Sequence, residues 1–286
     1  MKSPPLGYVR AMDMPDVFRL RANAGPDARV LAGGQSLLPT LAFRLSDPGT
    51  LIDITRVDAL RGIRLVADGA LRVGALTTHA ELGRDALVRV RVPVLADAVG
   101  LIAHPAIRNR GTIGGSLAYA DPAAELPAVC VALDAVVIAV GPAGERRIAA
   151  RDFLTGLFTT ALAGDELIAA VEFRPMPGRR TVIHELARRS GDYAMAGIVL
   201  AAGPGTPTHD PRPVFFGVGD RPILATRAAA CLAVGGAAAL AAAQAALDGD
   251  LDPPSDQHGG PAFKRQLARV LLARAVNSLI DARDAR

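Results

Sequence analysis

The sequence predicts an α+β protein in two parts, a longer N-terminal part and a shorter C-terminal part. Three observations predict this class. Within residues 1–56, strand-like and helix-like patterns alternate as in a small βαβ unit. Residues 174–180, RPMPGRR, have the Pro-, Gly- and Arg-rich composition of a domain boundary. After this boundary three strand-like segments precede helical ones, which predicts a short antiparallel sheet followed by helices.

The N-terminal elements follow from apolar periodicity and from capping residues. Thr78 and Glu81 stand three residues apart at the start of one helical segment, which is the spacing of a capping box. Asp68 and Gly69 form the turn of a hairpin between 63–66 and 70–74. The other expected helices are 15–23, 37–45, 93–101 and 126–133, and the other expected strands are 28–32, 50–54, 135–140 and 166–173.

The C-terminal elements follow from the same patterns. We expect strands at 181–188, 194–202 and 214–218, an alanine-rich helical region at 225–247, and a last helix at 261–282 with a periodic apolar stripe. The expected domains are therefore 1–176, with subdomains at about 1–56 and 57–176, and 177–286.

Composition excludes several classes of protein. Half of the 286 residues are hydrophobic and 21% are charged, so the chain is globular rather than disordered. No apolar run reaches the roughly 20 residues of a membrane helix, and the first residues lack the apolar region of a signal peptide. The net charge is +4, but the arginines are scattered and few aromatics lie among them, which argues against a nucleic-acid-binding face.

The cysteines and histidines, which are common metal ligands in proteins, do not have the number or spacing of a metal site here. The two cysteines, Cys130 and Cys231, lie in apolar stretches, and an iron–sulfur cluster needs about four thiolates. The five histidines have no metal-ligand spacing, and no nucleophile–base pair is evident. We expect both thiols to be buried and inert, and we expect no metal on this chain. The expected location is the reducing cytoplasm, which includes the inner face of the membrane.

Two glycine pairs are the candidate binding motifs. In LAGGQSLLP, Gly33-Gly34 follows an apolar run and precedes Ser36 and a helix-like segment. In RNRGTIGGSL, Gly114-Gly115 lies between Thr112 and Ser116. Glycine permits positive φ and close approach of the backbone, and successive N–H groups in such a turn form a nest for phosphate oxygens. Two nests facing each other across a cleft would suit a diphosphate.

The residues alone leave a second interpretation open, in which each pair is a tight turn without a ligand. Neither stretch matches the G-x-G-x-x-G or the G-x-x-x-x-G-K-[ST] pattern.

Four stretches together resemble one family in order and spacing over nearly the whole chain. They are LAGGQSLLPTLAFRL, IRNRGTIGGSLAYADPAAELPAVCVALDA, LARRSGDYAMAG and FFGVGDRPIL. The family is the medium, FAD-binding subunit of molybdenum hydroxylases, which includes aerobic carbon monoxide dehydrogenase and the flavin portion of xanthine dehydrogenase. The resemblance implies a two-subdomain FAD-binding domain of the vanillyl-alcohol-oxidase (PCMH) type, followed by a small domain of three-stranded antiparallel sheet plus helices.

The resemblance also implies a set of residues that bind non-covalent FAD. The two glycine turns would form the two walls of the diphosphate site. Asp121 and Glu125 would accept hydrogen bonds from ribityl or ribose hydroxyls. Four residues from the segments 167–168 and 192–193 would lie near the flavin. The set is Ala32, Gly33, Gly34, Gln35, Ser36, Leu37, Thr112, Gly114, Gly115, Ser116, Asp121, Glu125, Leu167, Ile168, Asp192 and Tyr193.

The sequence departs from the commonest family pattern at three positions. Gln35 stands where many relatives have His, and Ser116 stands where many have Asn. Both changes keep hydrogen-bonding capacity. Glu185 stands about where many relatives have Lys, and a carboxylate there would not stabilise an anionic flavin.

The resemblance implies an electron-transfer subunit of a larger complex. A large chain would hold the molybdenum cofactor, a small chain would hold [2Fe–2S] clusters, and the assembly would be a dimer of heterotrimers. FAD would take electrons from the clusters and pass them to an external acceptor. Two alternatives are a self-contained FAD oxidase of the same fold and a scaffold without cofactor. Gln35 and Cys130 argue against the covalent flavin found in many such oxidases, and the glycine turns argue against the scaffold.

Overall fold

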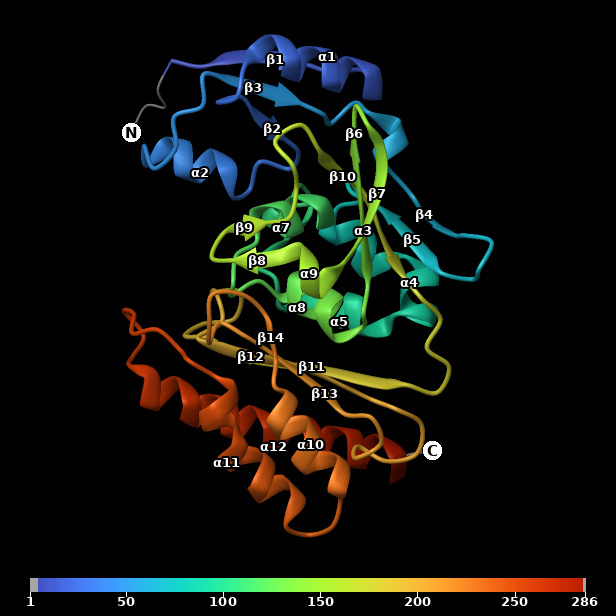
Figure 1. Ribbon diagram of the computed structural model, residues 1–286, viewed down its shortest axis with the longest axis vertical. Coiled ribbons are helices and arrows are strands. Elements are labelled where there is room, and N and C mark those ends of the chain that lie inside the picture. Colours follow the sequence, from blue (N-terminus) through green and yellow to red (C-terminus); the bar gives the residue numbers. More distant parts are fainter. Residues whose placement is uncertain (1–4, 285–286) are drawn as a thin grey trace.

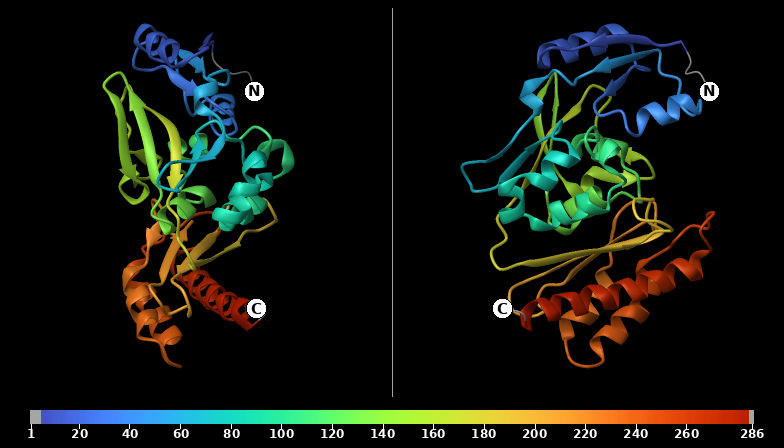
Figure 2. Two further views of the ribbon diagram at one scale, coloured as in Figure 1. Left: turned by 90° about the vertical axis from the view of Figure 1, so that its right-hand side faces the viewer. Right: turned by 180° about the vertical axis from the view of Figure 1, so that it is seen from behind.

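The computed structural model describes residues 5–284, with three layers along its long axis (Figure 1). A small parallel sheet with two helices forms one end, an antiparallel sheet with short helices forms the middle, and a second antiparallel sheet with three longer helices forms the other end. The side and rear views show the same order of layers (Figure 2).

The first layer is a three-stranded parallel sheet in the order β1-β3-β2. Its elements are β1 (Gly7–Arg10), α1 (Met14–Ala24), β2 (Arg29–Leu31), α2 (Leu37–Ala42) and β3 (Thr50–Asp53). Asp13 caps α1 by accepting a hydrogen bond from the Asp16 amide at 2.8 Å, and Gly25 ends the helix at φ 81°. The helix expected at 37–45 ends earlier, because Arg44 adopts a left-handed conformation with φ 57°.

The middle layer is a five-stranded antiparallel sheet in the order β4-β5-β10-β6-β7. Its strands are β4 (Ile63–Leu65), β5 (Leu71–Gly74), β6 (Val136–Gly141), β7 (Gly144–Ala149) and β10 (Leu167–Phe173), and β8 (Leu154–Gly156) and β9 (Thr159–Thr160) form a separate ribbon. Its helices are η1 (Asp58–Leu60), α3 (His79–Arg84), α4 (Ala86–Arg91), α5 (Pro93–Leu101), α6 (Pro105–Arg108), α7 (Ile113–Tyr119), α8 (Glu125–Ala132) and α9 (Ala150–Phe153). The expected hairpin and the capping box of Thr78 and Glu81 are both present.

The C-terminal sheet has four strands rather than the expected three, in the order β11-β12-β13-β14. They are β11 (Arg180–Leu186), β12 (Ala196–Ala202), β13 (Arg212–Phe216) and the two-residue β14 (Ile223–Leu224), which returns after a tight turn to pair with β13. The helices are α10 (Thr226–Val234), α11 (Ala239–Asp250) and α12 (Pro261–Asp284). The alanine-rich stretch is split into two helices because Gly235 and Gly236 both have positive φ.

The C-terminal sheet packs on both faces, which fixes it against the middle layer. On one face Val199, Val214 and Phe216 join the core that contains α8, and on the other face Ile198 and Phe215 join the core formed with α10–α12. Every residue of β12 is buried as a result. All eight residues of α8 are buried too, since this helix lies between the two sheets.

Candidate functional site

One large cavity brings the predicted site residues together. Its volume is about 920 Å³, near the upper end of ligand pockets in proteins. Residues of the first layer, of the middle layer and of the loop between β11 and β12 line it. All sixteen residues proposed from the sequence are part of this lining: Ala32, Gly33, Gly34, Gln35, Ser36, Leu37, Thr112, Gly114, Gly115, Ser116, Asp121, Glu125, Leu167, Ile168, Asp192 and Tyr193.

The first glycine turn presents unused backbone donors to this cavity. The four consecutive N–H groups from Gly33 to Ser36 donate to no acceptor among the described residues. Gly34 has φ 74°, a conformation that glycine adopts without cost. Such a series of partly exposed amides suits the oxygens of a diphosphate, so these residues fit the diphosphate of FAD.

The first turn also touches the second segment directly. A Cβ atom on Gly33 would lie 2.8 Å from the carbonyl carbon of Arg110 and 3.0 Å from Cα of Gly111. Gly33 therefore lets two backbone segments, more than 70 positions apart in the sequence, pack against each other beside the cavity.

The second glycine pair is not a nest, which corrects the expectation. Gly114 and Gly115 lie in the first turn of α7, with Thr112 as its N-cap. Their N–H groups are already used: that of Gly114 donates to the carbonyl of Ala75 at 2.9 Å, and that of Gly115 donates to Oγ1 of Thr112 at 3.1 Å. The space left by the missing Cβ of Gly114 is filled by Ala75. This wall offers the Ser116 hydroxyl and a smooth backbone surface.

Acidic and phenolic side chains gather in another part of the lining. Glu125 begins α8 and is 9% exposed, and burial raises its pKa to about 8. Burial also raises the pKa of Asp121, whose Oδ1 accepts a hydrogen bond from the Ala123 amide at 2.9 Å. Tyr193 has a raised pKa, first because the cleft wall desolvates its hydroxyl and then because Asp121, Tyr119 and Glu125 lie nearby. Exposed Asp192 precedes Tyr193 in the same loop.

Leu167 and Ile168 form an apolar part of the wall at the start of β10. Both side chains are buried, and the pairing of β10 with β6 is irregular between Ile168 and Ala170. Such an irregularity bends the strand and changes the direction of its side chains.

Three further lining residues carry no signal that the sequence analysis used. His79 is buried with neither ring nitrogen hydrogen-bonded to a described residue, and burial lowers its pKa to about 4, so the ring is neutral. Tyr119 and Phe158 meet edge to face, with ring centroids 5.2 Å apart. Only the spatial neighbourhood shows that these residues belong to the site.

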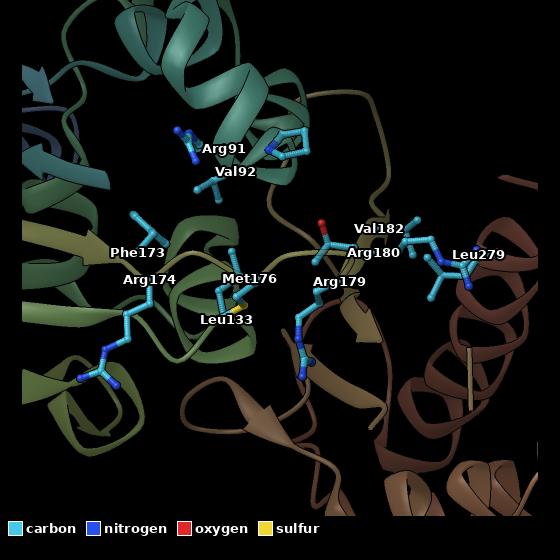
Figure 3. A pocket seen from close by; sticks show the side chains of 12 residues that line it. Arg91, Val92, Leu133, Phe173, Arg174, Met176, Arg179, Arg180, Val182 and Leu279 are labelled. Atoms are coloured by element: carbon cyan, nitrogen blue, oxygen red, sulfur yellow. Dashed lines mark hydrogen bonds between the residues drawn. The ribbon is translucent and has the colours of Figure 1, made fainter. Parts of the chain in front are cut away.

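A second, smaller hollow of about 210 Å³ lies at the junction of the domains and is lined by several arginines (Figure 3). Arg179 pairs with Asp210, and Arg180 donates to the carbonyls of Leu279 and Gly205. The side chains of Arg91 and Arg174 do not converge on one point in Figure 3. This hollow therefore lacks the arrangement of an anion site.

The two N-terminal layers, the large cleft and the consecutive free amides are the features of a protein that binds a cofactor with a diphosphate, and a further layer of sheet and helices follows them. Residues 4–176 match the family described as "FAD binding domain in molybdopterin dehydrogenase". Residues 181–279 match "CO dehydrogenase flavoprotein C-terminal domain".

Curated relatives and solved structures agree with these matches. The chain is 41% identical over 283 residues to the 6-hydroxypseudooxynicotine dehydrogenase complex subunit alpha of Paenarthrobacter nicotinovorans, covering 96% of this chain and 95% of the relative. It is 33% identical over 284 residues to the carbon monoxide dehydrogenase medium chain of Hydrogenophaga pseudoflava, covering 97% and 98%. A chain of quinoline 2-oxidoreductase from Pseudomonas putida 86 superposes with a TM-score of 0.92, at 36% identity and 99% coverage of both chains.

The chain therefore belongs to the family of FAD-binding medium subunits of molybdenum hydroxylases, and it is an oxidoreductase subunit. Across residues 5–284, no helix has both the length and the apolar character that a membrane crossing requires. The same residues contain no group of three or more His, Cys, Asp or Glu side chains placed to hold a metal ion.

Proposed function

We propose that this chain carries electrons through FAD between an iron–sulfur partner and an external acceptor. The oxidation of the substrate then takes place at a molybdenum centre on another chain. Bound FAD supplies the redox chemistry, and the residues of this chain hold it and set its surroundings. The observation that carries the proposal is the series of free amides from Gly33 to Ser36, which open into a cavity lined by all sixteen predicted residues.

We assign different tasks to the parts of the cleft. The amides of Gly33–Ser36 bind the diphosphate, with the Ser116 hydroxyl as a donor from the opposite wall. Asp121 and Glu125 contact hydroxyl groups of the cofactor, and Leu167, Ile168 and Tyr193 contact the flavin. The neutral ring of His79 fits a cofactor wall because it places no charge beside the flavin.

The proposed organisation extends to domains and partners. Residues 1–176 form the FAD-binding domain, with subdomains at 1–56 and 57–176, and residues 177–286 form the C-terminal domain. The relatives include medium chains and complex subunits, so the proposed partners are a large molybdenum-binding chain and a small [2Fe–2S] chain. We propose a dimer of heterotrimers in the cytoplasm.

Reconstitution tests this division of labour. The purified full chain is mixed with FAD, freed of excess cofactor, and examined for the flavin absorption spectrum. It is expected to bind FAD and to accept electrons from a chemical reductant, yet to oxidise no organic substrate without a molybdenum-containing partner. Substrate oxidation at full rate by the chain with FAD alone would contradict the proposal and favour a self-contained oxidase.

A further inference from the structure

The junction between the FAD cleft and the C-terminal sheet contains two carboxyl groups without a cation. Glu125 lies in the cleft wall at the start of α8, and Glu185 lies on β11 of the C-terminal sheet. Among residues 5–284, neither side chain takes part in an ion pair. Oε2 of Glu185 is buried and has no hydrogen-bond partner among those residues.

Strand register places Glu185 on the face of the sheet that meets the FAD-binding domain. Ile183, two positions earlier on the same face, packs against the core that contains α8, whereas His184 between them points to the other face and contacts Ser278 of α12. Across the sheet, Glu185 is paired with Gly197, and Gly197 is paired with Phe216. The Phe216 ring lies over Gly197, so the row beside Glu185 offers an apolar surface and no polar partner.

The same row is tied to the segment that carries Glu125. The amide of Gly217, directly after Phe216, donates to the carbonyl of Pro122 at 2.8 Å. Pro122 lies in the loop between α7 and α8, so this hydrogen bond fixes the start of α8 against the C-terminal sheet. The start of α8, which carries Glu125, is thereby tied to the strand row that carries Glu185, and the charge of Glu185 adds to the upward shift that burial causes in the pKa of Glu125.

The charged groups around this junction do not neutralise it. Asp121 from the α7–α8 loop adds a third carboxyl group, and the hydroxyls of Tyr119 and Tyr193, whose pKa values are raised, stay neutral. From α12, Lys264 donates to the carbonyl of Gly217 at 3.2 Å, but it also pairs with Asp256. Arg108 donates to the carbonyls of Ile102 and Ala103. The buried Glu125, and the half-buried Glu185 with its buried Oε2, have an acidic neighbour and no cation, and this favours the protonated form.

We propose that Glu125 is held as a neutral carboxylic acid that donates a hydrogen bond to FAD, and that Glu185 is the positioning residue that keeps it neutral. A neutral acid carries an O–H donor that a carboxylate lacks. This inference rests on the proposed FAD contacts and changes the expected role of Glu125 from acceptor to donor. A lysine at position 185 would instead favour the ionised form of Glu125.

The raised pKa values agree with this arrangement. Burial raises the pKa of Glu125 to about 8, and the charges of Glu185 and Asp121 raise it further in the same direction. Burial raises the pKa of Glu185 to about 7. At neutral pH the Glu125 carboxyl is therefore mostly protonated.

The test is the pH dependence of FAD binding by the full chain, measured from flavin fluorescence between about pH 5.5 and 9.5. The wild-type dissociation constant is expected to be level at low pH and to rise by up to about tenfold per pH unit once Glu125 ionises. Glu125→Gln, whose amide donates at every pH, is expected to abolish the rise. Glu185→Lys is expected to move its onset to lower pH by at least about one unit, and Glu185→Gln by less.

Glu145→Gln is the matched control, because Glu145 is an exposed glutamate on β7 outside the cleft lining. It is expected to keep the wild-type profile. A rise that persists in Glu125→Gln, or an onset that Glu185→Lys leaves in place, overturns the proposal. FAD binding without any pH dependence overturns it as well but leaves the proposed function standing, whereas a chain that binds no FAD at all contradicts the proposed function itself.

Infrared spectroscopy gives a second readout that does not depend on the variants binding FAD. Wild-type protein is expected to show the carbonyl band of a buried neutral carboxyl group at pH 7, and this band is expected to disappear on raising the pH. The band should weaken in Glu125→Gln, where Glu185 with its own raised pKa still contributes, and it should fall further in the double variant Glu125→Gln/Glu185→Gln, with folding checked by circular dichroism. A band of unchanged strength in Glu125→Gln contradicts the proposal. If wild-type protein lacks a buried neutral carboxyl at pH 7, the proposal is wrong.

Discussion

Replacing Gly33 by alanine is expected to weaken FAD binding strongly. The new methyl group would lie 2.8 Å from the carbonyl carbon of Arg110 and 3.0 Å from Cα of Gly111, which are backbone atoms that cannot rotate away. The turn must therefore retreat by about 1 Å to reach ordinary carbon contact distances. Gly34 differs, because its Cβ would meet the flexible side chain of Leu38 at 2.9 Å and because its φ of 74° would strain an alanine there.

The size of the effect follows from hydrogen-bond geometry. A shift of about 1 Å stretches a bond of about 2.9 Å beyond the useful range, and each bond to a charged group contributes about 1.5–3 kcal/mol. The loss of two amide–phosphate bonds therefore costs at least about 3 kcal/mol, which raises the FAD dissociation constant by roughly 100-fold or more. We expect this increase in a titration of the cofactor-free chain with FAD, followed by flavin fluorescence.

A matched control separates this effect from general damage to the fold. Gly49→Ala adds the same methyl group in the same layer, at a position with open space around the new atom and outside the cleft lining. It is expected to bind FAD like the wild type. If Gly33→Ala, with an unchanged melting temperature, also binds FAD with wild-type affinity, the assignment of the first turn to the diphosphate is refuted.

Three further outcomes are expected. Thr112→Ala removes the cap of α7 and should cost about 1 kcal/mol of unfolding free energy, which a lower melting temperature would show. Its loss of FAD affinity should be smaller than that of Gly33→Ala, because the Gly115 amide donates to Thr112 and not to the ligand. The pKa of Glu125 is about 8 in the folded chain and 4.5 in the unfolded one, so the stability that this carboxyl contributes to the cofactor-free chain is fully present below about pH 4.5 and is lost as the pH rises to about 8. The unfolding free energy of the wild type should therefore fall relative to that of Glu125→Gln over this range, by several kcal/mol at most, and a difference that stays constant would contradict this. Acid precipitation should release all flavin into the supernatant, since Gln35 is no covalent anchor and burial raises the pKa of the Cys130 thiol; flavin retained in the pellet would favour a covalent oxidase.

Elements with strong local signals could be predicted from the sequence, and exposed strands could not. Thr78 and Glu81 specify the start of α3 through their own hydrogen bonds, and Pro93 begins α5 as expected. The strands β1 and β7 were missed because most of their residues are exposed, so no alternation marks a buried face. The position of β1 depends on pairing with β3, which is distant in the sequence, and that of β7 depends on pairing with β6, which is apolar where β7 is charged.

The residues that line the cavity could be named because the resemblance covers them, not because periodicity reveals them. Sixteen residues from widely separated segments line one cavity, and no local pattern places them together. The aromatic residues Tyr119 and Phe158 and the buried ring of His79 were missed for a related reason. Their residue types are equally common in cores, and only their neighbours in space connect them with a ligand.

The two glycine pairs look alike in sequence but meet different physical requirements. Gly33 and Gly34 keep the first turn close to the 110–111 backbone and leave consecutive amides without partners, which is the condition for binding an anion. Gly114 and Gly115 let a helix begin against Ala75, and its amides are satisfied within the protein. A glycine pair therefore indicates a close contact of the backbone. Whether its amides already donate to acceptors within the protein decides if they are free to bind a ligand. By this criterion we expect the first turn to make most of the hydrogen bonds to the diphosphate, and the second wall to provide shape and one hydroxyl group.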